Sequence, residues 1–321
     1  SKKDNHAITE KINKIVKMGS NLIGNHIIFV NYSCTAGHVV VEDFVTIGAY
    51  SGVHQFCTLG KHSFLARAGI VTKDVLPFTM VDCRENKAIG ILIDIDKKKI
   101  EKVKKYYLNQ YEDVSLEFFV GDITDEKFKD KIRKKIIKKY GKIDVLINNA
   151  AVDYKVDIKH KKLIKKTQLK NFDLKLWNKD LEVGLTGALI CTKYFGAEME
   201  RKKKGIILNI ASDLSFIAPD NRIYNDKSNI HIVKPVSYSV VKHGVIGLTK
   251  YTAAYWASKN IRCNALAPGG IKTNQPKTFL RKISKLIPMK RMAKDGEYKS
   301  SILFLISDAS SYMNGSVIIA D

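Results

Sequence analysis

The feature that most constrains the fold is a change in sequence periodicity near residue 90. Before it, an apolar or small residue recurs at every sixth position. After it, short apolar runs alternate with longer amphipathic segments. A six-residue repeat is typical of a parallel β-helix, whereas β-α alternation predicts a parallel sheet with crossover helices. We therefore expect two domains, residues 1–90 and residues 91–321.

The first domain is expected to be a short left-handed parallel β-helix. In that architecture three short strands form one triangular coil of about 18 residues, and the repeated side chain points into the stack. The length of the repeat allows about three coils. The repeated positions are Ile23, Phe29, Thr35, Val41, Ile47, Val53, Leu59, Leu65 and Val71.

The residues within this repeat are more specific than its period. The informative segments are Ala36-Gly37-His38-Val39, Gly52-Val53-His54-Gln55-Phe56-Cys57, Val71-Thr72-Lys73-Asp74-Val75 and Phe78-Thr79-Met80-Val81. As far as about Gly90 they resemble the UDP-N-acetylglucosamine acyltransferases that begin lipid A synthesis. The resemblance implies a trimer in which His38, His54 and Gln55 line a cleft for the acyl donor and the nucleotide sugar.

One residue of this resemblance departs from the family in a way that affects chemistry. Aligning Ile23-Gly24-Asn25 places Gly19 where the family has its general base, and glycine cannot take the sugar hydroxyl proton as an imidazole does. The early coils and the C-terminal helical region of that family are also absent. The alternative interpretation of His38 and His54 is polar β-helix corners or a residual trimer surface.

The second domain is expected to be an α/β, incomplete doubly wound (Rossmann-like) parallel sheet. Apolar runs predict its strands and amphipathic periodicity predicts its helices. The expected strands are 91–96, 115–123, 143–148, 205–211, 261–266 and 316–320, and the expected helices are 97–111, 126–140, 173–201 and 236–257.

Tyr238 and Lys242 are the strongest chemical signal in this domain. Four residues apart on a predicted helix, they share one face, so both can act on one substrate. A tyrosine has a pKa near 10 and is a poor base at neutral pH, and a neighbouring ammonium favours the phenolate. The pair alone occurs by chance in many helices.

Three further segments place polar or glycine residues where predicted strands end. Because the carboxyl ends of strands are where open α/β sheets bind ligands, these segments are expected to share one site with the tyrosine. They are Asn148-Asn149-Ala150-Ala151, Asn209-Ile210-Ala211-Ser212 and Pro268-Gly269-Gly270. Together with Tyr238-x-x-x-Lys242 they resemble the short-chain dehydrogenase/reductase family over about 230 residues.

The resemblance implies an NAD-dependent oxidoreductase. Tyr238 is implied to exchange the proton, Lys242 to lower the pKa of Tyr238 and hold the nicotinamide ribose, and Ser212 to hydrogen-bond the reacting carbonyl. The cofactor carries the hydride. A carboxylate at Asp94 would bind the adenosine ribose and repel a 2′-phosphate, which favours NAD over NADP. The other implied cofactor contacts are Asp122, Asn148, Ala150, Pro268, Gly269 and Thr273.

Two departures from the family pattern concern the substrate side. Gly184 stands where many members have an asparagine that completes a proton relay. Either a water takes the place of that asparagine here, or the relay is broken. The segment Asp213–Pro235 is about twice the usual length, and long loops on a rigid sheet commonly shape substrate pockets. Asp220-Asn221-Arg222-Ile223-Tyr224 and Lys234-Pro235-Val236-Ser237-Tyr238 resemble a branch of bacterial surface-sugar and flagellin-modification enzymes, which implies a sugar-like substrate, phosphorylated or nucleotide-activated. Arg222 is a candidate anion contact, or else an exposed loop charge.

The family's first strand and its glycine-rich phosphate-binding turn have no counterpart before Ile91. That strand lies between the two strands expected at 91–96 and 143–148, so its omission predicts a gap of about twice the 4.8 Å strand spacing. Phe78–Val81 is a poor substitute. Only nine residues, Asp82–Gly90, follow it, whereas a parallel crossover needs a dozen or more.

Composition excludes several other classes. The net charge of +23 arises from lysines interleaved with apolar residues at helical spacing, which indicates solvated helix faces and argues against nucleic-acid binding. The five scattered cysteines suggest reduced thiols rather than a metal site. No run is long enough for a membrane helix and no signal core follows Ser1, so the cytoplasm is the expected location.

Three functional hypotheses follow. The first is an oxidoreductase acting on a hydroxyl or keto group of a sugar-like substrate, as a dimer or tetramer. The second is an acyltransferase-like, trimerising or nucleotide-sugar-binding module without its base. The third is an inactive fusion of two gene fragments, clipped at both ends and joined between about Cys83 and Ile93.

Overall fold

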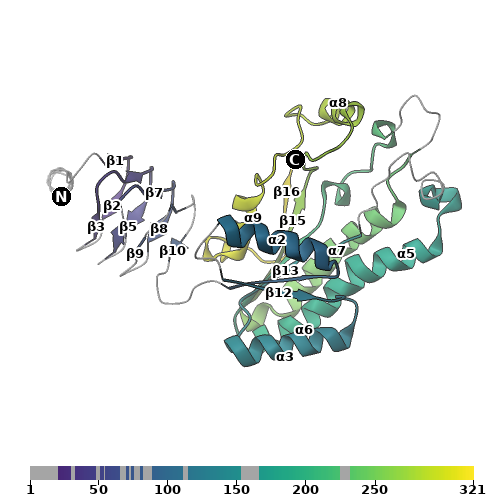
Figure 1. Cartoon of the computed structure of the whole chain (residues 1–321), viewed down its shortest axis with the longest axis horizontal. Helices are drawn as coiled ribbons and strands as arrows, with labels where there is room; N and C mark the ends of the chain where they lie inside the picture. The colour runs from purple at the N-terminus through teal and green to yellow at the C-terminus, as the bar shows by residue number, and fades with distance from the viewer. Residues whose placement is uncertain are drawn as a thin grey trace. The chain divides into compact units, whose positions relative to one another are not determined.

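The computed structural model describes residues 21–29, 33–47, 51–53, 55–65, 70–71, 74–75, 80–81, 89–110, 115–152, 166–224 and 232–321. The chain divides into two compact units, of which the second comprises Ile89–Ile306 and Ser311–Asp321 (Figure 1). Each unit has hydrophobic clusters of its own. The two are described separately below.

Two-residue strands build the first unit. Each pairs in parallel with a strand 18 residues away, as Leu22 with Val40 and Val40 with Thr58. Three sheets result, ordered β1-β4-β7, β10-β8-β5-β2 and β3-β6-β9. The strands are β1 Leu22–Ile23, β2 Ile28–Phe29, β3 Cys34–Thr35, β4 Val40–Val41, β5 Thr46–Ile47, β6 Gly52–Val53, β7 Thr58–Leu59, β8 Phe64–Leu65, β9 Ile70–Val71 and β10 Met80–Val81.

The six-residue repeat coincides with these strands. Each repeated residue is the second residue of one strand from β1 to β9. From β4 onward these side chains are buried in one apolar cluster, because alternate residues of a strand point to opposite sides and the repeat keeps one side inward. The cluster contains Val41, Ile47, Val53, Leu59, Leu65 and Val71.

Aromatic residues occupy several corners between these strands. His26, Phe44 and His62 all have φ between 57° and 59°, in the left-handed region that usually favours glycine or asparagine. Their rings stack with centroids 4.9 Å and 4.7 Å apart, and His38 stacks on Phe56 at 5.1 Å. Stacking between successive turns of the chain offsets part of the backbone cost at these corners.

The second unit contains two parallel sheets. One pairs β11 (Ile89–Asp94) with β12 (Ser115–Val120). The other has the order β13-β14-β15-β16, with β13 at Val145–Asn148, β14 at Gly205–Ile210, β15 at Ile261–Pro268 and β16 at Val317–Ala320. As the sequence predicts, β11 does not pair with β13. Met80–Val81 does not fill the gap, since β10 pairs with β8.

Helices cover both faces of these sheets (Figure 1). On one face α3, α6 and α7 bury Ile136, Met199 and Val245 against the strands. On the other, α9 buries Leu305 against β14 and β15, and α2 packs on β11 and β12. The helices are α2 Lys97–Gln110, α3 Glu126–Tyr140, α5 Leu174–Leu181, α6 Gly187–Lys202, α7 Val236–Tyr255, α8 Lys277–Leu286 and α9 Lys299–Ile306.

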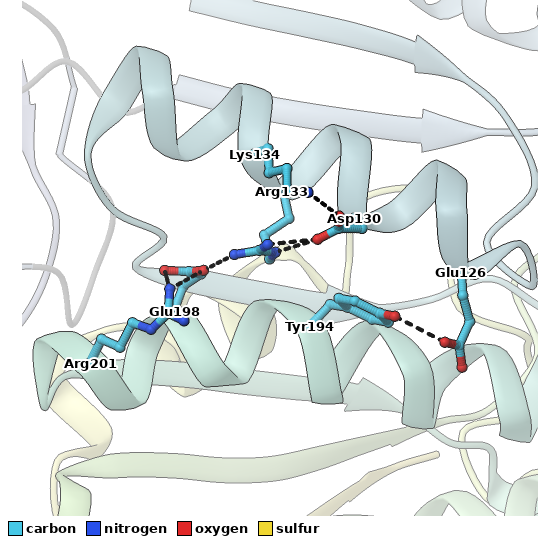
Figure 2. Close-up of polar contacts among 7 residues, drawn as sticks. All are labelled: Glu126, Asp130, Arg133, Lys134, Tyr194, Glu198 and Arg201. Carbon is cyan, nitrogen blue, oxygen red and sulfur yellow. Dashed lines mark hydrogen bonds and ion pairs between the residues drawn. The ribbon is translucent and has the colours of Figure 1, made fainter.

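An ion-pair network fastens α3 to α6 (Figure 2). Arg133 of α3 donates to Glu198 of α6 and to Asp130 one turn earlier on its own helix. Arg201 donates to Glu198 at 2.9 Å, and the Tyr194 hydroxyl donates to Glu126 at 2.9 Å. Because the Glu198 side chain is almost fully buried, this network satisfies a carboxylate that would otherwise be costly.

The expected long helix at 173–201 is confirmed, with a π-helical turn at Glu182–Thr186 that divides it into α5 and α6. At Gly184 an added Cβ would lie 2.5 Å from Cγ1 of Val241, so the glycine lets α7 approach closely. The expected first strand also moves from 91–96 to Ile89–Asp94, since the Asp96 carboxylate accepts the N–H groups that open α2. The sequence analysis did not predict α8 or α9.

Candidate active site

The residues expected to carry chemistry lie at the carboxyl ends of the strands. Asn148 ends β13, Pro268 ends β15, and Ser212 lies two residues beyond the end of β14. The 3-10 turn Asp213–Ser215 packs against α7, the helix that bears Tyr238 and Lys242. The structure therefore brings the turn after Ser212 onto the helix of the Tyr238–Lys242 pair.

Lys242 is held in place by the sheet. Its side chain is buried, and its Nζ donates to the backbone oxygen of Ile210 at 2.7 Å. Nζ of Lys242 lies 5.9 Å from the centroid of the Tyr238 ring, and Nζ of Lys234 lies 3.8 Å from the same centroid. Two ammonium groups therefore lie near the phenol. The sequence analysis did not single out Lys234, which precedes α7 by two residues.

Ser212 is buried and locally hydrogen-bonded. Its Oγ donates to Oδ1 of Asp213 at 2.6 Å and accepts the N–H of Leu214 at 3.2 Å. In this structure the hydroxyl proton is therefore directed at the Asp213 carboxylate. Asp213 is thus a further residue of this site that the family motif did not reveal.

The two acidic residues expected on the adenosine side both lie after strands of the β11–β12 sheet. Oδ1 of Asp94 accepts the N–H of Asp96 at 2.8 Å. Oδ1 of Asp122 accepts both the N–H and the hydroxyl of Thr124 at 2.8 Å. Each carboxylate thus uses Oδ1 in a local turn, and that bond fixes its orientation.

Asn148, an expected cofactor contact, has its side chain in a hydrogen-bonded amide chain. Its Nδ2 donates to Oδ1 of Asn209 at 2.8 Å and to Oγ1 of Thr192 at 3.1 Å. Nδ2 of Asn209 donates in turn to Oγ1 of Thr249 at 2.8 Å. This chain fixes the ends of β13 and β14 to α6 and α7. The signal for it in the sequence is a pair of asparagines inside apolar strands.

The remaining expected cofactor residues are spread over the same region of the second unit. Ala150 and Thr273 are exposed, and the N–H of Thr273 donates to Gln275. Gly269, after the end of β15 at Pro268, donates its N–H to Ala320.

Tyr298 supports Gly269 and was not predicted from the sequence. Its hydroxyl donates to the backbone oxygens of Gly269 and Ala320. Burial, and after it the neighbouring Asp213 carboxylate, raises the pKa of Tyr298. This tyrosine therefore stays a neutral donor at physiological pH.

These residues fit the two ends of a nicotinamide dinucleotide but not its pyrophosphate. Asp94 and Asp122 suit the adenosine end, and Tyr238 with Lys242 suits the nicotinamide end. Gly121 follows β12 and precedes α3, yet a Cβ there would lie 2.2 Å from the Phe128 ring, which fills that space. In the described parts of 89–152, no other strand leads through glycine into a helix N-terminus, the usual phosphate cradle.

Arg222 does not stand free as an anion contact. Its guanidinium pairs in a bidentate manner with Asp220, at 2.9 Å and 2.7 Å, and its side chain is 86% exposed. The hydrogen bonds from Arg222 lower the pKa of Asp220 to about 2. The exposed-loop interpretation of Arg222 therefore agrees better with the structure.

In the first unit, His38 stacks on Phe56, and Gln55 lies in an exposed turn. His54 and Gly19 lie outside the described residues.

Cys34, Cys57, Cys191 and Cys263 are free thiols. Burial raises the pKa of Cys191 to about 11 and that of Cys263 to about 12, so neither supplies a thiolate nucleophile near neutral pH.

Nowhere among the described residues do three or more His, Cys, Asp or Glu side chains gather in a way that suits a metal ion. None of the helices described is both long and apolar enough to span a membrane.

Three relatives with described functions match this chain. A Thermotoga maritima 3-oxoacyl-acyl-carrier-protein reductase is 33% identical over 204 residues, which is 62% of this chain and 73% of that protein. A Listeria innocua NAD-dependent glycerol dehydrogenase is 31% identical, covering 74% and 84%. The post-translational flagellin modification protein A of Campylobacter coli is 27% identical, covering 74% and 88%.

Solved structures share the fold. Levodione reductase superposes with a TM-score of 0.61 at 24% identity, covering 73% of this chain and 86% of that one. ElxO with NADP bound gives 0.58 at 26% identity, covering 72% and 86%. The family model described as enoyl-(acyl carrier protein) reductase matches residues 81–321. With the tyrosine–lysine pair on α7 and the parallel sheet, these matches show that the chain belongs to the short-chain dehydrogenase/reductase family.

Proposed function

We propose that this chain is an NAD-dependent oxidoreductase that interconverts a hydroxyl and a keto group on a sugar-like or polyol substrate. The observation that carries the proposal is the position of Lys242. Its ammonium donates to the backbone oxygen of Ile210, two residues before Ser212, and lies 5.9 Å from the centroid of the Tyr238 ring. Relatives that include a glycerol dehydrogenase and a flagellin-modification protein support the substrate class.

The proposed chemistry assigns one proton to these residues. When an alcohol is oxidised, its hydroxyl proton passes to Oη of Tyr238, and the Lys242 ammonium stabilises the phenolate state that accepts it. Ser212, whose hydroxyl donates to Asp213 in the structure, is proposed to turn its hydroxyl proton to the substrate oxygen, so that the substrate's own proton is left for Tyr238. A bound nicotinamide supplies the hydride acceptor. In the opposite direction Tyr238 returns the proton to the ketone oxygen.

The cofactor is proposed to be NAD rather than NADP. Asp94 ends β11 with one carboxylate oxygen accepting the N–H of Asp96, and its negative charge is proposed to repel the 2′-phosphate of NADP. One of the solved relatives carries NADP, so this preference rests on Asp94 of this chain. Asp94→Ser is expected to narrow the difference in affinity between NADH and NADPH.

A fluorescence titration with NADH tests the proposal directly. Binding with a dissociation constant in the micromolar range, lost when NADPH replaces NADH, is the expected outcome. Turnover of glycerol and larger polyols, abolished in Tyr238→Phe, is expected alongside it. The absence of a fluorescence change up to millimolar NADH contradicts the proposal for the chain as it stands.

A second candidate function concerns residues 1–90, proposed as a separate left-handed β-helix domain that resembles the acyltransferases. The pairing of its strands in parallel, each with a strand 18 residues away, supports a β-helical coil. The domain is proposed to trimerise, with His38 on its surface beside Phe56. Sedimentation of the intact chain as a monomer, with no affinity for a nucleotide sugar, contradicts it.

A further inference from the structure

Lys234 places a positive charge against the tyrosine of the proposed reaction. Its Nζ lies 3.8 Å from the centroid of the Tyr238 ring, closer than Nζ of Lys242 at 5.9 Å. An ammonium within about 6 Å of a ring centroid is attracted by the negative face of the ring. The contact therefore holds the Lys234 ammonium beside the group that is proposed to exchange a proton with the substrate.

The two lysines differ in their access to solvent. Lys242 is buried, and its Nζ donates to the backbone oxygen of Ile210 at the end of β14. Lys234 and Tyr238 are both half-buried. A substrate that reaches the exposed part of Tyr238 can therefore also reach Lys234.

The backbone at Lys234 is fixed on both sides. Its N–H donates to Oδ1 of Asn221 at 3.0 Å, across 13 residues of the chain. Asn221 opens the 3-10 turn Asn221–Ile223. On the other side Pro235 has a restricted φ and leads directly into α7, which begins at Val236. The position of Lys234 beside Tyr238 is therefore set by the fold of this loop.

The helix that packs on the same loop adds positive charge. Nζ of Lys282 in α8 donates to the backbone oxygen of Arg222 at 3.0 Å, and the rings of Phe279 and Tyr224 lie 5.5 Å apart. Every charged residue of α8 is basic, namely Lys277, Arg281, Lys282 and Lys285. Such a field attracts anions toward this side of the molecule. Lysine-rich helices occur elsewhere in the chain, so the field alone does not mark a site.

We propose that Lys234 forms a subsite for an anionic group, a phosphate or a carboxylate, that the substrate carries close to the carbon whose hydroxyl reacts at Tyr238. An ammonium has three donors and no acceptor, and its hydrogen bonds to anionic oxygens are stronger than those to neutral hydroxyls. Arg222 is a poorer candidate, because Asp220 balances its charge. The inference rests on the proposed function and narrows its substrate to a sugar or polyol that bears an anion.

The competing interpretation is that Lys234 acts on Tyr238 alone, by stabilising its phenolate state as Lys242 is proposed to do. That role affects every substrate by the same factor. An anion subsite, in contrast, affects only the substrates that carry the anion. The ratio between an anionic and a neutral substrate therefore separates the two roles.

Isothermal titration calorimetry of the full-length chain with glycerol, glycerol 3-phosphate and glycerate tests the subsite without requiring NAD or turnover. The preferred anion is expected to bind at least tenfold more tightly than glycerol, and its identity distinguishes a phosphate from a carboxylate. Added salt should weaken the binding of the anions only, because it screens the charge of Lys234. Equal affinity for all three compounds, or binding of neither anion at millimolar concentration, overturns the proposal.

Matched variants locate the subsite. Lys234→Met is expected to weaken binding of the anion at least tenfold and to leave glycerol unchanged, with Lys234→Gln in its place if the methionine variant does not fold. Lys234→Arg keeps the charge and should keep most of the affinity. Lys250→Met, at an exposed lysine in the C-terminal half of α7, should change nothing. Equal weakening by Lys234→Met and Lys250→Met overturns the proposal.

Steady-state kinetics separates this inference from the oxidoreductase assignment. The ratio of kcat/KM for the preferred anion to kcat/KM for glycerol should fall at least tenfold in Lys234→Met, mainly through KM of the anion. If kcat/KM falls by the same factor for both substrates, Lys234 acts on Tyr238 alone and the subsite is overturned. Anion binding that depends on Lys234, in a chain that turns over none of these compounds, contradicts the proposed oxidoreductase while the subsite stands.

Discussion

Nζ of Lys242 donates a hydrogen bond to the backbone oxygen of Ile210 at 2.7 Å, two residues before Ser212. The bond fixes α7 on the end of β14 and places the ammonium beside the Tyr238 ring. Lys242 is therefore both a structural and a chemical residue. Tyr238, in contrast, makes no side-chain hydrogen bond within the described chain.

This contrast predicts different outcomes for the two residues. Tyr238→Phe removes only the hydroxyl, so unfolding in urea should change by less than about 0.5 kcal/mol. Its turnover should fall by about 10²- to 10⁴-fold, because a positioned proton donor is lost. Lys242→Met should lose turnover and also about 1 to 3 kcal/mol of stability, since the buried Ile210 oxygen loses its partner. Equal stability of the two variants would contradict the structural role of Lys242.

Gly184 and Val241 form a complementary pair between the π-helical turn and α7. Because an added Cβ at Gly184 meets Cγ1 of Val241 at 2.5 Å, Gly184→Ala should destabilise the protein by about 1 to 3 kcal/mol. Val241→Ala removes the methyl group concerned, so the double variant should recover part of that loss. Thermal unfolding of the four proteins gives the coupling.

Gly247 of α7 is the control for this experiment. An added Cβ there meets nothing within 4 Å, so Gly247→Ala should stabilise the helix by about 0.5 to 1 kcal/mol. If both alanine variants shift stability in the same direction, close packing at Gly184 is not the cause. The same packing explains why the family's asparagine is not accommodated here, a point that sequence alone left as a choice between a water and a broken relay.

The Arg133–Glu198 pair predicts a stability difference between two substitutions in one network. Glu198→Gln removes a buried charge that receives Arg133 and Arg201, and should cost about 2 kcal/mol. Arg201→Gln should have no measurable effect, because its side chain is 70% exposed and Glu198 keeps Arg133. Urea unfolding at low and moderate salt measures both. A larger loss for the Arg201 variant would contradict this ranking.

The sequence predicted much of the fold because its signals were periodic. The six-residue repeat located nine strands, and the apolar runs located each strand of the second unit to within a few residues. The gap beside β11 also followed from counting strands. The π-helical turn around Gly184 could not be predicted, because the periodicity of residues 173–201 is continuous and Val241, which packs on this turn, lies on a helix distant in sequence.

The motifs in the sequence predicted which residues belong to the site better than they predicted the contacts that those residues make. Ser212, Tyr238 and Lys242 were expected from motifs. Asp213 and Lys234 contact Ser212 and Tyr238 from nearby in sequence but belong to no motif, and Tyr298 reaches Gly269 only through tertiary packing. Asn148 illustrates the reverse case. Its position at the end of β13 was expected, while its side chain turns to Asn209 and Thr192 inside the core.

Lys129 of α3 provides a prediction about pH. Its side chain is fully buried and its ammonium donates to the backbone oxygen of Ile123. Burial lowers the pKa of Lys129 below 10.5, because the desolvated charged form is disfavoured, although nearby carboxylates oppose the shift. Between the lowered pKa and 10.5 the unfolded chain binds more protons than the folded one. Stability conferred by this position therefore rises with pH in that window.

Lys129→Met replaces the ammonium with an apolar group of similar length. Its free energy of unfolding should exceed that of the natural chain by more at pH 7 than at higher pH, where Lys129 of the natural chain begins to lose its buried charge. Lys131→Met, on an exposed residue of the same helix, should show no such pH dependence. Urea unfolding of the three proteins at several pH values measures the difference in free energy of unfolding between each variant and the natural chain. The contributions of the other titrating groups cancel in this difference. A Lys129→Met advantage that grows with rising pH would contradict the direction of the shift.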